Sequence, residues 1–237
     1  MMPTTNSRDQ FIKHIFTTVA PFLDFLSSAF SFGLDHLWRR RAVALSGIVP
    51  GNNVLDICTG TGELAFQFAD VVGPAGSVTG TDFCEPMVHI ANRKRNGHGN
   101  VTFRVADAKS LPFPDGSFDA VTVAFGMRNI PDTILALKEI RRVLRPGGRF
   151  VCLELTRPSN RFFLFLYNWY LFRVMPFVSA LILKSSAPYL YLPRSIEAFY
   201  QPPEFRNVIA HNGFADVQVN SFTLGIATVY SASKDGR

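Results

Sequence analysis

Short apolar runs and helix-like segments alternate through the middle of the chain, and this alternation strongly limits the folds open to it. Each apolar run has the length of a buried strand, and the segment after it carries apolar residues at helical spacing. Strands joined by helices lie parallel in one sheet, with helices on both faces. The predicted strands are Val54–Cys58, Ser77–Thr81, Val101–Val105, Ala120–Phe125 and Arg149–Leu155, and the predicted helices are Glu63–Val72, Pro86–Asn96 and Asp132–Val143.

The C-terminal part adds a helix and a hairpin. Pro203–Asn212 is a predicted helix that ends at Gly213, and strands follow at Asp216–Phe222 and Ile226–Ser231. The linker between these strands is short enough for a hairpin, so one of them is antiparallel to the rest of the sheet. The predicted fold class is α/β: a doubly wound, Rossmann-like, seven-stranded, mostly parallel sheet with one antiparallel strand near the C-terminus.

Length and composition fit one domain with elaborations. The 237 residues are 47% apolar and 18% charged, which is sufficient for a substantial core. The first fifty residues have a helical pattern rich in phenylalanine, which suits a lid over the crevice at the carboxyl ends of the strands. The predicted organisation is a helical lid (1–50), a core sheet (51–156), an apolar helical insertion that faces substrate or membrane (157–202), and a C-terminal helix with strands (203–237).

One segment, Phe162–Leu183, is long and apolar enough to resemble a membrane span. Arg173 lies at its centre and Pro176 follows closely, and a central arginine costs at least about 2.5 kcal/mol on insertion scales. We therefore predict two helices broken near Val174–Pro176. These helices either pack on the core or form a surface that meets lipid or a lipid-like ligand.

The formal net charge of +6 comes from the two ends of the chain, because residues 51–156 are neutral. The longest basic run is Arg39-Arg40-Arg41, which argues against nucleic acid as a partner and favours weak, transient attraction to an anionic membrane. The N-terminus lacks the pattern of a secretory signal, and the three cysteines lack the spacing of a zinc site, so we expect reduced thiols and no metal. The expected location is the cytoplasm, peripherally at the inner face of the membrane.

A glycine-rich turn follows the first predicted strand. Gly60, Gly62 and Ala65 match the pattern G-x-G-x-x-G/A, which proteins that bind nicotinamide, flavin or S-adenosylmethionine (SAM) share. Residues without large side chains allow the backbone and the helix N-terminus to approach a nucleotide. The pattern is weak by itself, because a tight strand-to-helix turn can produce it as well.

Acidic residues accompany the first three predicted strands. Asp82 ends the second strand, where a carboxylate can accept hydrogen bonds from both hydroxyls of an adenosine ribose. Asp56, in the first strand, can bind the cationic amino group of methionine but would repel a pyrophosphate. After the third strand, Asp107 can accept from the adenine amine, and Ala108 offers a backbone N–H. The three acids together favour SAM over a nicotinamide dinucleotide.

Several segments match successive motifs of one large enzyme class: DICTGTGEL, TDFCEPM, ADAKSLPFPDGSFDAVTVAFGMRNI and RRVLRPGGRFVCLEL. They resemble the class I SAM-dependent methyltransferases. FSFGLDHLWRR, FGMRNI, LELTRP and YLYLPRSI resemble more narrowly the menaquinone/ubiquinone biosynthesis C-methyltransferase family of the UbiE/MenG type. The resemblance runs from about Asp24 to Tyr230. It implies transfer of a methyl group from SAM to a ring carbon of a polyprenylated quinol.

The resemblance also implies that Thr61, Asp82, Asp107 and Ala108 contribute to SAM binding in the core of residues 51–156. The chain departs from the family where Leu23, Ser27, Asp35 and Ala124 replace a tyrosine, an asparagine, a histidine and a serine, with His36 one place after the replaced histidine. These departures affect the expected contacts to the substrate more than those to SAM.

The expected reaction requires a ring carbon held in line with the S–CH3 bond and made nucleophilic by ionisation of a hydroxyl. Arg128, just after the fourth predicted strand, is our candidate for stabilising the phenolate, and Asn129 for orienting the ring oxygen. His36 and Asp24 in the lid are secondary candidates for removing the ring proton. The alternative for Arg128 is an ion pair with a structural carboxylate such as Asp132.

This function has three alternatives. A methyltransferase for another lipid-like molecule has the same scaffold, and a weakly active, membrane-associated accessory protein is compatible with the departures. A nicotinamide-dependent oxidoreductase needs a proton relay such as Tyr-x-x-x-Lys, which the sequence lacks. Demethylmenaquinol is the first expectation for the acceptor, with a benzoquinol as the other choice. The sequence is compatible with a homodimer but does not determine the oligomeric state.

Overall fold

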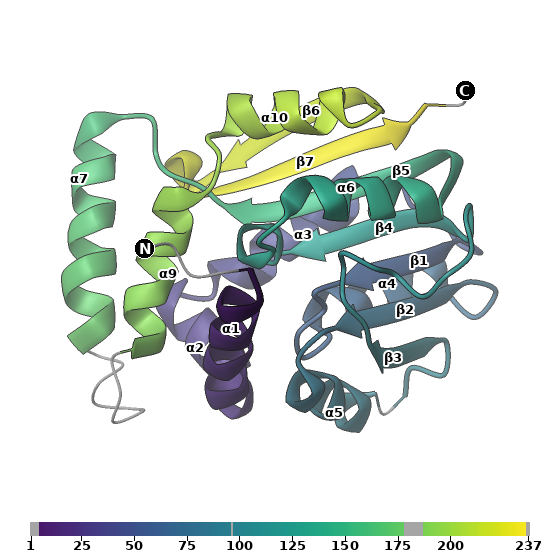
Figure 1. Ribbon diagram of the computed structural model, residues 1–237, viewed down its shortest axis with the longest axis horizontal. Coiled ribbons are helices and arrows are strands. Elements are labelled where there is room, and N and C mark those ends of the chain that lie inside the picture. The colour runs from purple at the N-terminus through teal and green to yellow at the C-terminus, as the bar shows by residue number, and fades with distance from the viewer. Residues whose placement is uncertain (1–4, 96, 178–186, 236–237) are drawn as a thin grey trace.

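The computed structural model describes residues 5–95, 97–177 and 187–235. Their strands form one seven-stranded sheet in the order β3-β2-β1-β4-β5-β7-β6 (Figure 1). The chain builds outward from β1 to β3 and then returns to β4 on the other side of β1. This reversal is the switch point at which doubly wound sheets bind ligands. The strands are β1 (Asn53–Ile57), β2 (Ser77–Asp82), β3 (Val101–Val105), β4 (Phe118–Ala124), β5 (Leu144–Leu155), β6 (Phe214–Phe222) and β7 (Ala227–Lys234).

Strand directions agree with the sequence prediction. β1 to β5 pair in parallel, and β7 is antiparallel to both β5 and β6, so the predicted fold class is confirmed. β5 begins at Leu144 rather than at the predicted Arg149, because Leu144 already pairs with Phe118. Gly147, with a φ of 72°, then lets the backbone turn within this strand.

Helices cover both faces of the sheet (Figure 1). α6 illustrates why they pack there: Ala136, Leu137, Ile140 and Val143 share one side of the helix, and all four are fully buried. One face of the sheet carries α3 (Leu34–Leu45), α4 (Glu63–Val72) and α5 (Glu85–Lys94), and the other carries α6 (Thr133–Val143) and α10 (Pro202–His211).

Two groups of helices meet beyond the carboxyl ends of the strands. In Figure 1, α1 (Thr5–Val19) and α2 (Leu23–Phe30) lie at the end of the sheet to which β4 points, beside α7 (Arg161–Trp169) and α9 (Ala187–Ala198). Buried Leu26 of α2 packs in one apolar cluster with side chains of the insertion, which joins the N-terminal helices to it. The insertion contributes Tyr167, Leu171, Met175 and Ile196 to this cluster.

The predicted break near Val174–Pro176 is wrong. The chain stays helical through Phe177, and a π-helix over Tyr170–Val174 ends two residues before Pro176. In this wider turn the N–H of Met175 donates to the carbonyl of Tyr170, and the changed spacing accommodates the proline without a break. Residues 178–183 of the predicted second helix lie outside the described residues.

No single helix among the described residues is both long and apolar enough to cross a membrane. One pair, Arg8–Phe30 with Leu34–Leu45, passes the test of length and composition only when taken together, and the two parts are bent by 91°.

Candidate active site

A cavity of about 340 Å³ lies at the carboxyl ends of β1, β2, β3 and β4. Its lining includes Asp56, Asp82 and Asp107 from the strand ends. Side chains of the N-terminal helices and of the insertion complete it, among them Leu26 and Leu171. The cavity therefore joins an acidic region at the sheet to an apolar region under the helices.

Asp56 is buried in the floor of this cavity, with 1% of its surface exposed. Its two carboxylate oxygens accept hydrogen bonds from the hydroxyls of Thr59 (2.6 Å) and Thr122 (2.7 Å). Burial raises the pKa of Asp56 to about 6, against the effect of these two hydrogen bonds. The carboxylate is thus fixed in place beside the glycine-rich turn.

Asp82 lies across the glycine-rich turn from Asp56. Its carboxylate accepts from the backbone N–H of Gly60 (2.9 Å) and of Cys84 (2.9 Å), and burial raises its pKa to about 6. Gly62 has a φ of 92°, and a Cβ there would lie 2.8 Å from Cζ of Phe103. Glycine is therefore required at this position for both its backbone conformation and its close packing.

The loop after β3 supplies Asp107 and Ala108 to the cavity lining. Asp107 accepts from the backbone N–H of Lys109 (2.9 Å), and the ammonium of Lys109 lies 3.6 Å from the same carboxylate. This ammonium also donates to Asp9 of α1 (2.7 Å). Lys109 thus ties the loop to the N-terminal helix above it.

The ends of β1 and β4 approach each other closely. A Cβ at Gly126 would lie 2.5 Å from Cβ of Cys58. Cys58 and Phe125 both have a left-handed backbone, with φ of 51° and 58°. Such conformations are costly away from glycine and are concentrated at functional sites.

Arg128 lines the cavity just beyond β4. Its Nη1 donates to Oε1 of Glu154 (2.5 Å) and to the carbonyl of Phe125 (2.5 Å), and its backbone N–H donates to Oε2 of Glu154 (3.1 Å). Asp132, the alternative partner considered above, instead caps α6 by accepting from the N–H of Leu135. The Nε of Arg128 is buried and has no hydrogen-bond partner within the described part of the chain.

Asn129 connects the end of β4 to the insertion. Its side-chain N–H donates to the carbonyl of Phe125 (3.2 Å), and its oxygen accepts from the hydroxyl of Tyr191 on α9 (2.9 Å). These two contacts fix the orientation of the amide group. Among the described residues, the second amide N–H of Asn129 has no partner.

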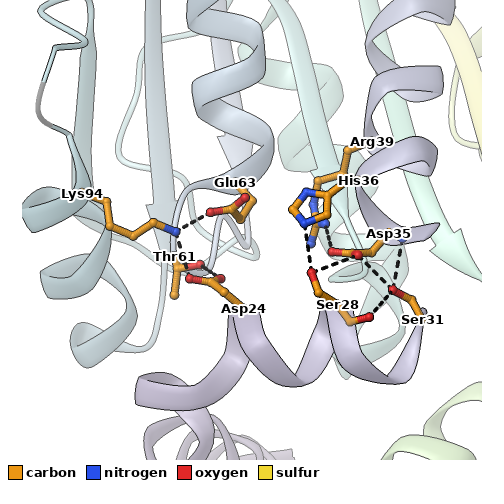
Figure 2. A network of polar contacts seen from close by, with 9 residues as sticks. All are labelled: Asp24, Ser28, Ser31, Asp35, His36, Arg39, Thr61, Glu63 and Lys94. Atoms are coloured by element: carbon orange, nitrogen blue, oxygen red, sulfur yellow. Dashed lines mark hydrogen bonds and ion pairs between the residues drawn. The ribbon is translucent and has the colours of Figure 1, made fainter. Parts of the chain in front are cut away.

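The structure places the two lid candidates differently (Figure 2). Asp24 lines the cavity, accepts from the hydroxyl of Thr61, and pairs with the ammonium of Lys94 (2.9 Å), which also pairs with Glu63. The exposed ring of His36 instead contacts the hydroxyl of Ser28 (2.9 Å) and is absent from the cavity lining. Asp24 is thus close to the glycine-rich turn, whereas His36 is not.

Sequence reasoning missed several side chains at this site. Glu154 is fully buried and holds Arg128, and Tyr191 holds Asn129. Both lie within segments that carry the family resemblance, and a lone carboxylate in the otherwise apolar run Phe150–Leu155 was a signal for Glu154. Tyr167 and Arg39 also line the cavity. Arg39 lies in the basic run and in the FSFGLDHLWRR segment, which were not interpreted as part of the site, whereas no local pattern marked Tyr167.

The charges around the cavity fit SAM better than a dinucleotide. Carboxylates outnumber cations in its lining, which favours a ligand with a sulfonium and an ammonium group and disfavours a pyrophosphate. The seven acidic residues are Asp9, Asp24, Asp35, Asp56, Glu63, Asp82 and Asp107, and the three basic residues are Arg39, Lys109 and Arg128.

Comparison with known proteins assigns the chain to a family. It matches the ubiE/COQ5 methyltransferase family over residues 4–234. The chain belongs to this family. A relative from Thermus thermophilus, named demethylmenaquinone methyltransferase, is 45% identical over 91% of this chain and 98% of its own length. A relative from Geobacter sulfurreducens, named ubiquinone/menaquinone biosynthesis C-methyltransferase UbiE, is 41% identical over 94% of this chain and 88% of its own.

Membership of the ubiE/COQ5 family makes the chain a SAM-dependent methyltransferase. The fold agrees, since a solved SAM-dependent methyltransferase from Aquifex aeolicus superposes with a TM-score of 0.62 at 22% identity, covering 82% of this chain and 88% of that one. The sequence predictions of the enzyme class, the cofactor and the family are confirmed.

The raised pKa values of Asp56 and Asp82 predict that SAM binding depends on pH. Under the sequence prediction that Asp56 and Asp82 hold SAM, their ionised forms attract its cationic and donor groups more strongly than the neutral acids do. Affinity should therefore be constant above pH 7 and fall as the pH drops through about 6. The same carboxylates should destabilise the ligand-free protein as the pH rises from their ordinary pKa of 3.8 to about 6, because over this range the unfolded state releases protons that the native state still holds.

Calorimetric dissociation constants for SAM between about pH 5 and 8 measure this dependence. Asp82→Asn removes one of the two titrating groups, so its affinity should vary less steeply with pH than that of the wild type. An affinity that is constant down to pH 5 would contradict the prediction.

Proposed function

We propose that this enzyme methylates a ring carbon of a polyprenylated quinol, with demethylmenaquinol as its acceptor. The observation that carries the proposal is the two-part cavity. Arg128 and Asn129 offer polar contacts for ring oxygens beside the acidic cofactor region, and Leu26, Tyr167 and Leu171 form an apolar wall suited to a prenyl tail. The printed names of the relatives support the same class of acceptor.

On this proposal the strand ends hold the cofactor. Asp82 accepts from the ribose hydroxyls, Asp107 accepts from the adenine amine, and Ala108 donates its backbone N–H. Gly60, Thr61 and Gly62 let the backbone approach the ligand. Asp56 attracts the ammonium group, although Thr59 and Thr122 already occupy one lone pair on each of its oxygens.

Bound SAM supplies a strongly electrophilic methyl group. The chain's own part is to place a ring carbon beside it and to favour the ionised form of the ring hydroxyl. Arg128 is suited to the second task because Glu154 holds its guanidinium and leaves other N–H donors for an oxyanion. Asn129, oriented by Tyr191, can donate to the same oxygen or its neighbour. Asp24 is then the acceptor for the ring proton, because His36 lies outside the cavity.

The acceptor is tested with SAM and a panel of short-chain acceptors: demethylmenaquinol, its benzoquinol counterpart, and a simple lipid-like phenol. We expect methyl transfer to demethylmenaquinol with the highest kcat/KM. Turnover of the phenol alone would overturn the proposal in favour of a different lipid-like substrate. Absence of turnover with all three, in a protein that binds SAM, would favour an accessory role.

We also propose transient association with the inner, anionic membrane surface, where such an acceptor resides. α7 exposes large apolar side chains, and exposed Arg161 and Arg173 flank them. The apolar set on α7 is Phe162, Phe165, Leu166 and Trp169.

Vesicle sedimentation tests this association. The protein should partition onto vesicles with anionic lipid, and less so as salt rises or when Phe165 and Trp169 are both replaced by serine. Ile134→Ser and Leu135→Ser on α6 form a matched control pair, because those apolar side chains are exposed elsewhere. Recovery only in a fraction that requires detergent would contradict a peripheral mode.

A further inference from the structure

The amino-acid end of SAM carries a carboxylate for which the acidic side chains of the cofactor region provide no partner. It carries a carboxylate as well as an ammonium group, and seven carboxylates line the cavity. A carboxylate taken from water into such surroundings needs a cationic hydrogen-bond donor. The lining offers three basic side chains: Arg39, Lys109 and Arg128.

Two of these cations have other roles. Lys109 is paired with Asp9 and Asp107, in the loop after β3 where the adenine is expected. Arg128 is held by Glu154 at the end of β4, where the acceptor ring is expected. Arg39 on α3 is the remaining candidate within the described lining.

Arg39 is buried and fixed along one edge of its guanidinium. Its Nη1 donates to Oδ2 of Asp35 (2.5 Å), and the side chain is 10% exposed. Asp35 is itself held by the hydroxyls of Ser31 (2.9 Å) and Ser28 (3.2 Å) (Figure 2). Within the described residues these are the hydrogen bonds of the two side chains, so the Nε and Nη2 donors of Arg39 are left for a ligand.

The neighbours of Arg39 place it near the amino-acid end of the cofactor. Its guanidinium carbon lies 5.2 Å from the centre of the Phe125 ring, at the end of β4, and its charge acts on Asp56 at the adjacent end of β1. Asp56 is the proposed partner of the ammonium group. Arg39 and Asp56 would therefore bracket the two opposite charges of the same amino-acid group.

Asp35 keeps the pair oriented over the physiological pH range. Burial acts to raise the pKa of Asp35, but the hydrogen bond and charge of Arg39 outweigh it, and the pKa lies below its usual value. The carboxylate therefore stays ionised, and one edge of the guanidinium stays occupied. A planar guanidinium held on one side is pre-organised for a bidentate contact on another.

We propose that Arg39 binds the carboxylate of SAM, with Asp35 as the residue that positions it. The inference rests on the assignment of the acidic strand ends as the SAM site and is independent of the methyl acceptor. The competing explanation is that Arg39 and Asp35 form an ion pair within α3 that only stabilises the helix.

Calorimetry with two ligands separates these explanations. Decarboxylated SAM keeps the adenosine, the sulfonium and the amine but lacks the carboxylate. Arg39→Gln should weaken SAM binding roughly tenfold to a hundredfold, the effect of losing charge-assisted hydrogen bonds, while the affinity for decarboxylated SAM stays the same. Arg39→Lys should recover part of the loss, because an ammonium keeps the charge but not the planar fork.

Retained binding of decarboxylated SAM also proves that the variant is folded. Equal weakening of both ligands, or an unchanged affinity for SAM, would overturn the proposal. If Arg39→Gln does not fold, Arg39→Lys provides the test. The proposal then requires that Arg39→Lys weakens the binding of SAM more than the binding of decarboxylated SAM. Asp82→Ala is the matched control, because it should weaken both ligands alike and so tests the SAM site itself.

Discussion

Replacing Arg128 by alanine should lower kcat by roughly 10²–10³ while the dissociation constant of SAM changes little. On the proposed mechanism the guanidinium faces an oxyanion that is fully developed only as the quinol hydroxyl ionises, so its loss should affect the transition state more than either bound ligand. Arg128→Lys should recover only part of the rate, because the contact with Glu154 uses the guanidinium geometry. Steady-state rates and calorimetry on the same preparations measure both quantities.

The control for this experiment must account for the buried charge of Glu154, which loses its partner in the Arg128→Ala variant. This carboxylate is fully buried, and the alanine variant would leave it unpaired, which destabilises proteins by several kcal/mol, about 3–5 in known cases. The double variant Arg128→Ala/Glu154→Gln removes the unpaired charge and should recover the melting temperature but not kcat. Normal turnover in either variant would show that Arg128 is only structural, as would recovery of both quantities together.

Replacing Asp82 by alanine should weaken SAM binding roughly tenfold to a thousandfold, by the loss of charge-assisted hydrogen bonds and the exposure of unpaired donors. The donors left unpaired include the N–H groups of Gly60 and Cys84. Asp82 is buried and has a raised pKa, so its ionised form costs free energy in the empty protein. The Asp82→Asn substitution removes this cost but also one of the two accepting oxygens, since Gly60 and Cys84 donate to different oxygens. We therefore expect the ligand-free Asp82→Asn protein to melt close to the wild type at pH 7.

Asp70→Ala is the control for Asp82, because Asp70 is exposed on α4 and pairs with His98 outside the cavity. It should bind SAM with the affinity of the wild type. An unchanged dissociation constant in folded Asp82→Ala would remove Asp82 from the cofactor site.

The sequence was sufficient for the sheet, because alternation of apolar runs and helical segments is a local property of the chain. The same holds for the glycine-rich turn and for the acids at the strand ends, since each follows a strand that could be recognised by itself. The π-helix before Pro176 could not be foreseen, because a proline in a helical pattern more often ends the helix.

Strand pairing explains which carboxylate forms the ion pair with Arg128, a choice that the sequence left open. Arg128 lies four residues from Asp132 along the chain but pairs with Glu154. The register of the sheet explains this choice, because Ala124 at the end of β4 lies opposite Leu153 of β5. The residues just beyond each of these positions are then neighbours, which no local pattern reveals.

The orientation of α3 about its axis explains why His36 lies outside the cavity. Successive residues of an α-helix point about 100° apart, so Asp35 and His36 cannot both face the cavity. The structure turns Asp35 inward, where it holds Arg39, and leaves His36 exposed. The sequence offered His36 and Asp24 alike as candidate bases, whereas the packing of α3 on the sheet places Asp35, and not His36, at the cavity.

The most direct test of the central claim is where the methyl group of SAM is transferred. Purified enzyme is given SAM labelled with ¹³C in the methyl group and a short-chain demethylmenaquinol, and the product is examined by NMR. We predict that the label appears on a ring carbon, and that the Arg128→Ala protein forms this product far more slowly. A label on a ring oxygen, or no labelled quinone from a protein that binds SAM, would contradict the account.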